Sequence, residues 1–214
     1  MMKKILTLLL LLLCSVAGAD EKSDKMLSAL WGKVSAMENY QVRFTVGYSG
    51  GGPARMEEQT GYYLVAGNSY YMSVMSAEVY CDGKTRYEVD PVNMTVSISK
   101  VDPKDRTMLS NPTRAFDFLD HSYTSAYMGE TKYAGAPCSR IELKAKDASQ
   151  EAFETITVWV DSRTGLPSGV SYVIEGGQTI WITVKELAAV KTPDRAKMTF
   201  DRKKYKDYDF IDFR

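Results

Sequence analysis

The chain has 214 residues, of which 44% are hydrophobic, and its 27 lysines and arginines balance 27 aspartates and glutamates. This composition is globular and excludes a disordered or fibrous chain. The zero net charge argues against a nucleic-acid-binding protein. With one histidine and three cysteines the chain has few soft ligands for a four-ligand His/Cys zinc site, so we expect no metal.

Residues 1–19 have the pattern of a cleaved secretory signal peptide. Two lysines precede a ten-residue apolar run at 5–14, and the small residues at 17–19 suit a cleavage site. The run is too short to favour a membrane anchor. Lipidation at Cys14 is disfavoured because a leucine, not a small residue, precedes it. We therefore expect an exported mature chain that begins at Asp20.

Only Cys81 and Cys138 remain in the mature chain, an even number for an oxidising compartment. One disulfide between them is the first interpretation. Two separate buried thiols are the second, since free cysteines are often buried. The sequence gives both interpretations equal weight.

The first predicted element is an amphipathic helix over residues 23–37, with Ser23 as its N-cap. Period-two alternation and short turns then predict an antiparallel meander. The predicted strands cover residues 42–48, 57–65, 70–75, 78–81, 85–89 and 95–101, with a second group at 125 onward, 138–146, 155–160, 170–175 and 178–184.

Two further features interrupt or join these strands. Pro112 and the apolar spacing after it predict a short helix that ends near His121. Gly176-Gly177 predicts a hairpin, and a two-residue loop there would place Tyr172 opposite Trp181. We expect a single domain over residues 20–214.

The sequence offers little for catalysis. His121 is the only imidazole, so a nucleophilic triad would depend on it alone. The three glycines at 50–52 lie between two strands and predict a turn, not a phosphate-binding loop. We expect no cofactor and no enzymatic activity, with a hydrolase that uses His121 as the remaining alternative.

The aromatic residues leave two packing arrangements open. Trp159 and Trp181 fall on strand faces opposite the aliphatic residues of their own strands. Both faces of the sheet therefore need cover. Either a curved sheet surrounds a ligand cavity, or helices fill that space as in an ordinary α+β core.

The order of these features resembles a known family. The helix reads LSALWGKV at 27–34, a DGKT turn follows at 82–85, and Asn111-Pro112 opens the central segment. A late strand at 155–160 with its turn, and MTF at 198–200, complete the pattern. Over nearly the whole mature chain it is similar to the periplasmic outer-membrane lipoprotein carriers, the LolA-like family.

This resemblance implies an α+β fold, an incomplete (half-open) antiparallel β-barrel with a helical lid over a hydrophobic cavity. It also implies a periplasmic monomer that takes acylated lipoproteins from an inner-membrane release complex to an outer-membrane acceptor. The residues that we expect to line the cavity and lid are Trp31, Tyr63, Tyr70, Met72, Phe116, Leu119, Tyr172 and Trp181.

One position departs from the family. Its members commonly carry a basic residue before a proline where the third strand begins, and this chain reads AGNSY at 66–70. A lipid-binding or envelope-sensing protein of the same fold, with a different cargo, is therefore the alternative function.

Overall fold

The computed structural model describes residues 20–49, 58–102, 105, 107–118, 122–174 and 176–214. The predicted signal peptide, the 50–52 turn, Leu119 and His121 lie outside the described residues. Within the described residues, no helix combines the length and the apolar character needed to cross a bilayer.

Helix α1 (Glu21–Ser35) is the only α-helix among the described residues. Its N-cap is Asp20, not the predicted Ser23, because the Asp20 carboxylate accepts a hydrogen bond from the Lys22 backbone N–H at 3.0 Å. Ser23 lies in the first turn and is buried. Its hydroxyl donates to the Asp20 carbonyl and also lies 2.6 Å from the hydroxyl of Ser125.

Twelve strands form one open sheet in the order β12-β6-β5-β4-β3-β2-β1-β11-β10-β9-β8-β7. The pairs are antiparallel except that β12 runs parallel to β6. The strands are β1 (Asn39–Ser49), β2 (Gln59–Ala66), β3 (Ser69–Val74), β4 (Ala77–Cys81), β5 (Thr85–Asp90), β6 (Thr95–Lys100), β7 (Tyr123–Tyr133), β8 (Ala136–Ala145), β9 (Thr155–Asp161), β10 (Pro167–Val173), β11 (Thr179–Ala189) and β12 (Asp209–Asp212).

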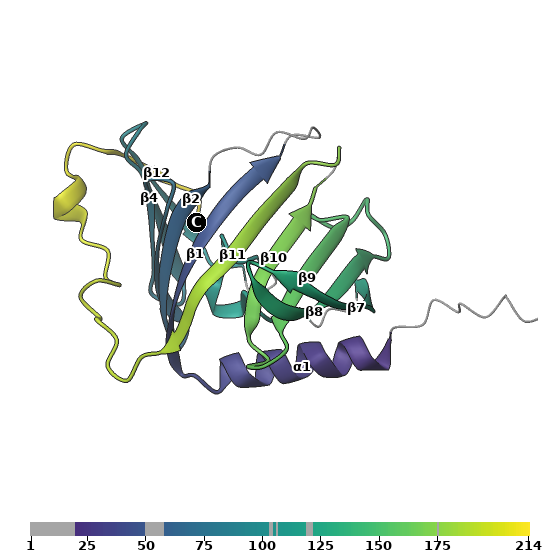
Figure 1. Ribbon diagram of the computed structural model, residues 1–214. Coiled ribbons are helices and arrows are strands. Elements are labelled where there is room, and N and C mark those ends of the chain that lie inside the picture. Colours follow the sequence, from purple (N-terminus) through teal and green to yellow (C-terminus); the bar gives the residue numbers. More distant parts are fainter. Residues whose placement is uncertain (1–19, 50–57, 103–104, 106, 119–121, 175) are drawn as a thin grey trace, which may run out of the picture.

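The sheet is strongly curved, and α1 runs across one end of it (Figure 1). Asp20 contacts Ser125 in β7, and the Lys33 ammonium donates to the carbonyl of Thr164 in the β9–β10 turn. The helix therefore extends from the β7 edge to the start of β1. The open, unclosed antiparallel sheet with α1 across it is consistent with the expected half-open barrel.

The face of the sheet that packs against α1, here called the concave face, carries the larger hydrophobic core. Alternate residues of β1, β2, β3, β9 and β10 point to this face, as the period-two pattern predicts. Leu27, Leu30 and Val34 of α1 join the same core and are almost fully buried.

The opposite, convex face of β2–β6 is covered by the C-terminal segment (Figure 1, yellow). This segment includes the short 3-10 helix η2 (Arg202–Tyr205) and ends in β12. Met198 and Tyr205 are buried there against Tyr71 and Tyr80. Both faces of the first half of the sheet are therefore covered by the chain itself.

Two sequence predictions are corrected. The central helix is reduced to η1 (Pro112–Arg114), one 3-10 turn, because the following residues leave the helical path to pack Phe116 and Phe118 into the core. The β10–β11 hairpin exists, but Val173 pairs with Thr179, so its loop has five residues. Tyr172 consequently pairs with Ile180, not with Trp181.

Candidate functional site

The concave face gathers most of the residues expected to bind a ligand. Tyr63, Tyr70, Met72, Phe116 and Tyr172 all belong to its core and are at most 3% exposed. Trp31 is half-buried and packs against the same core from α1. The fold therefore brings six of the eight predicted residues into one apolar cluster.

The predicted placement of Trp181 in the cavity is wrong. It pairs with Gly47 and Ser171, whereas the neighbouring Ile182 pairs with Val46 and Val170 and is fully buried in the concave core. Successive side chains of a strand point to opposite faces. Trp181 therefore lies on the convex face, away from the predicted cavity.

An irregular segment of the chain covers the concave face. Residues 101–118 follow β6 and place Met108, Ala115 and Phe116 in the core without measurable exposure. Apart from η1, this covering segment has no regular secondary structure in its described part. It occupies the position where the sequence resemblance implies a helical lid.

Two tyrosines of the sheet hold the covering segment by hydrogen bonds. The Tyr40 hydroxyl donates to the carbonyl of Pro112, and the Tyr70 hydroxyl donates to the carbonyl of Ser110, both at 2.9 Å. Burial raises the pKa of both phenols above the ordinary value. They therefore stay protonated and keep their donor function across the physiological pH range.

Another buried tyrosine has no partner. The hydroxyl of Tyr63 is inaccessible to solvent and forms no hydrogen bond among the described residues, whereas the hydroxyl of Tyr172 lies against the Met108 backbone. Burial raises the pKa of Tyr63 well above its ordinary value. A buried donor without a partner costs roughly 1–3 kcal/mol. The concave face therefore contains a hydrogen-bonding group that a ligand could satisfy.

A cavity of about 360 Å³ opens between the covering segment and the β8–β9 loop. Its walls include Phe118, Phe153, Ile156 and Tyr172. Four carboxylates also line it, from Asp102, Asp105, Asp117 and Glu151. An apolar interior with charged groups beside it is typical of a site that takes an amphipathic molecule.

A second cavity, of about 410 Å³, lies at the end of α1. Trp31, Tyr40 and Val65 line it together with the Gly67-Asn68 turn. Arg195 of the C-terminal segment also reaches this cavity. A basic residue is therefore present beside the turn that lacks one in the sequence, although it comes from a distant segment.

Arg86 is a site residue that sequence reasoning missed. It pairs with Cys81, and its guanidinium contacts the carboxylate of Glu88 at 2.6 Å. Its Nε atom is buried without a hydrogen-bond partner. Strand alternation places Arg86 on the concave face beside Tyr70. The alternation of residues along β5 would have placed Arg86 on the concave face only if the sequence had shown which face of β5 is concave.

Cys81 and Cys138 are both free and buried. Cys81 belongs to the concave core on β4, whereas Cys138 lies on β8 with its thiol 3.4 Å from the Ser168 hydroxyl. The interpretation as one disulfide is therefore wrong. Among the described residues, no group of histidine, cysteine and carboxylate side chains could hold a metal ion.

No family model and no curated protein matches the chain. Among solved structures, an uncharacterized conserved protein from Thermus thermophilus is similar at 10% identity, with a TM-score of 0.56 over 90% of this chain and 99% of that one. A LolA superfamily protein from Nitrosomonas europaea is similar at 11% identity, covering 84% and 98%, with a TM-score of 0.44.

The MucA/MucB complex from Pseudomonas aeruginosa is a further neighbour at 17% identity and a TM-score of 0.46, over 85% of this chain and 62% of that one. The chain thus spans less than two thirds of that protein. At 10% identity, the similarity to the Thermus protein shows that the two chains share a fold and shows nothing of their function. One structural neighbour is described as a LolA superfamily protein, the family that the sequence resembles.

Proposed function

We propose that this protein binds the acyl chains of lipoproteins non-covalently on its concave face. It carries them through the periplasm from an inner-membrane release complex to an outer-membrane acceptor, without enzymatic activity. The observation that supports this proposal is that the covering segment lies over the concave face. An extended apolar surface is closed by an irregular segment that two tyrosine hydroxyls fasten to the sheet.

The energetics suit a carrier that loads and unloads. A sixteen-carbon chain gains roughly 12 kcal/mol gross on burial, at about 0.8 kcal/mol for each methylene. The covering segment buries Met108 and Phe116 on the same face, so cargo and segment compete for it. The net affinity is lowered by the free energy needed to displace the segment. Reversible binding follows from this competition.

The test removes the hydrogen bonds that attach the covering segment to the sheet. In a Tyr40→Phe/Tyr70→Phe double variant, both hydrogen bonds to the segment are lost while the rings remain. Each such bond contributes roughly 1 kcal/mol. We expect the apparent affinity for a fluorescent sixteen-carbon acyl probe to rise about thirtyfold.

Tyr80→Phe is the matched control. Tyr80 lies on the convex face, where its hydroxyl is 2.9 Å from that of Tyr205. Its loss removes a buried tyrosine hydrogen bond without touching the covering segment, so the probe affinity should stay unchanged. A double variant that binds the probe no more tightly than the control, while folded by circular dichroism, would contradict the proposal.

A different cargo is the second candidate. The four carboxylates around the 360 Å³ cavity favour a molecule without negative charge, and strand β3 begins without the family's basic residue. Native mass spectrometry of the mature protein from its own periplasm separates the two. An acylated lipoprotein peptide supports the carrier, and a free uncharged or cationic lipid supports the second candidate.

A further inference from the structure

Positive charge is concentrated in one segment of the chain. Residues 191–206, here called the basic tail, contain seven of the chain's 27 lysines and arginines but only two of its 27 acidic residues. The rest of the chain is therefore net acidic. Like charges so close together in sequence repel one another, and an external anion offsets that repulsion.

The basic tail is fixed to the convex face by its aromatic and apolar residues. Met198 and Tyr205 are buried, and the ring of Phe200 stacks on Tyr87 with 4.3 Å between centroids. Two of its cations also lie over aromatic rings, Lys197 on Tyr62 and Arg202 on Phe210. The backbone of the basic tail is thus anchored, and its remaining cations are held outside the sheet.

These remaining cations face solvent. Lys191, Arg195, Lys203, Lys204 and Lys206 are all exposed. None of the ion pairs found among the described residues involves Lys203, Lys204 or Lys206. These three lysines cluster on and just after η2, which projects from the side of the molecule (Figure 1). They therefore form a solvated cationic surface.

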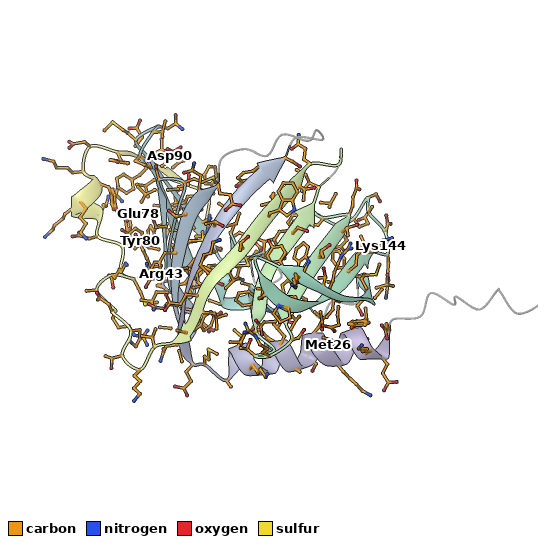
Figure 2. The ribbon with its side chains drawn as sticks, viewed as in Figure 1. Met26, Arg43, Glu78, Tyr80, Asp90 and Lys144 are labelled. Carbon is orange, nitrogen blue, oxygen red and sulfur yellow. The ribbon has the colours of Figure 1, made fainter. Side chains whose placement is uncertain are left out.

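An exposed apolar turn lies next to this cluster. Val92 and Met94, in the β5–β6 turn, are 82% and 47% exposed. The Met94 carbonyl accepts a hydrogen bond from the Asp209 backbone N–H at 2.9 Å, only three residues after Lys206. The Asp90 carboxylate fixes the turn by accepting from the Val92 and Asn93 backbone N–H groups. Figure 2 labels Asp90 at this edge of the sheet.

We propose that the basic tail and the β5–β6 turn together dock the protein on an anionic lipid bilayer. Lysines attract the negatively charged headgroups, and an exposed valine and methionine at a turn insert at the boundary between headgroups and acyl chains. The apolar turn favours a bilayer over an acidic protein, because charge pairing alone would not need it. Asp207 and Asp209 moderate the attraction, which suits a reversible contact.

This inference does not depend on acyl cargo. The docking surface lies on the convex side and the β6 edge, and none of its residues belongs to the concave core. Vesicle binding of the cargo-free protein therefore tests docking alone. A failure of cargo binding leaves that result untouched.

The experiment is co-sedimentation of the mature protein with vesicles. We expect it to pellet with phosphatidylglycerol/phosphatidylethanolamine vesicles at low salt and to stay in the supernatant with phosphatidylcholine vesicles. Binding should fall steeply as the salt rises from about 0.05 M to about 0.5 M, because screening shortens the range of the attraction.

Two variants with matched controls locate the surface. Lys203→Gln/Lys204→Gln/Lys206→Gln should lower the partition coefficient about a hundredfold. Lys132→Gln/Lys144→Gln/Lys146→Gln removes the same charge at the far end of the sheet, where Figure 2 labels Lys144, and should change it at most a few fold. Val92→Asp should weaken binding about tenfold. Met128→Asp, at an exposed apolar position on β7, should not.

Three results would overturn the proposal. The first is wild-type protein that stays in the supernatant with anionic vesicles at low salt. Binding to an acidic protein without binding to these vesicles would count in the same way. Equal losses in the two lysine triple variants would show attraction by total charge alone. Unchanged binding of Val92→Asp would remove the apolar turn from the surface.

Discussion

Gly61 shows how one residue permits the packing of the concave face. It pairs directly with Phe44 across β1 and β2, and the Phe44 ring lies flat over it. A Cβ atom at this position would stand 2.3 Å from two carbons of that ring. Only glycine leaves room for Phe44 to reach Tyr63, with 5.8 Å between ring centroids.

We predict that Gly61→Ala destabilises the fold by about 1–3 kcal/mol, because it forces an overpacked core to shift. Urea unfolding followed by circular dichroism measures the change. Gly32→Ala is the control, since nothing lies within 4 Å of its added Cβ and alanine favours the helix by about 0.5–1 kcal/mol. Equal stability of Gly61→Ala and the wild type would refute the close approach.

Glu78 is the polar centre of the convex core. Its carboxylate accepts hydrogen bonds from the hydroxyls of Tyr71, Tyr205 and Tyr80 at 2.6, 2.7 and 3.3 Å. Partial burial by itself would raise the pKa of Glu78, but these hydrogen bonds outweigh it and hold the pKa below its usual range. The charged carboxylate thus stabilises the packing of the C-terminal segment.

A depressed folded-state pKa contributes stability above the unfolded pKa, and that stability is lost as the pH falls through the folded value. We therefore predict that the free energy of unfolding falls between about pH 5 and pH 3. In Glu78→Gln this fall should be shallower. Glu58→Gln, an exposed control, should follow the wild type in urea titrations at each pH. Parallel curves for Glu78→Gln and the wild type would contradict the assignment.

At the scale of elements, Asp20 joins α1 to the edge of the sheet. One carboxylate oxygen accepts from the Lys22 backbone N–H at 3.0 Å, and the other accepts from the Tyr127 backbone N–H in β7 at 3.1 Å. The Asp20 backbone N–H also donates to the Ser125 carbonyl. One side chain therefore caps the helix and occupies the open edge of β7.

We predict that Asp20→Ala costs about 1–2 kcal/mol of stability, because a helix cap and an edge hydrogen bond disappear together. Glu21→Ala removes only the exposed ion pair with Lys25 and should cost at most about 0.5 kcal/mol. Thermal unfolding compares the two variants. Equal melting temperatures would show that the helix cap and the contact with β7 together contribute no more than an exposed ion pair.

At the scale of the whole molecule, the C-terminal strand covers one edge of the sheet. The edge of β6 is covered by β12, which pairs with it in parallel over Asp209 to Asp212. The Phe213 backbone N–H extends this pairing to the Ile98 carbonyl at 2.8 Å. An uncovered strand edge is a template for pairing with another chain. We therefore expect the short C-terminal strand to shield the edge of β6 from such pairing.

We predict that deletion of residues 209–214 makes the protein associate in a concentration-dependent manner. Size-exclusion chromatography with light scattering measures the mass. Phe213→Ser removes a 68% exposed apolar side chain but keeps the backbone pairing, and should match the full-length chain. A truncated protein with the same mass at all concentrations would show that β12 does not protect the edge.

Local sequence signals were sufficient to predict α1 and the positions of β1–β11, because alternation, turn residues and helical spacing involve only neighbouring residues. The family resemblance, not a local pattern, implied that Tyr63, Met72 and Phe116 share one apolar environment, and all three belong to the concave core. Local signals did not determine the face on which Trp181 lies. The β10–β11 loop has five residues, so the pairing of the two strands is shifted by one residue from the predicted register. A shift of one residue moves a side chain to the opposite face of the sheet.

The cover of each face likewise depends on tertiary contacts. The stretch over residues 112–119 has helical spacing, yet packing of Phe116 and Phe118 into the concave core leaves its described part, 112–118, one 3-10 turn. The separation of Cys81 from Cys138, and the wrapping of the C-terminal segment over β2–β6, depend on contacts between residues distant in sequence. Local patterns carry no information on such contacts, since they follow from how the whole sheet curves.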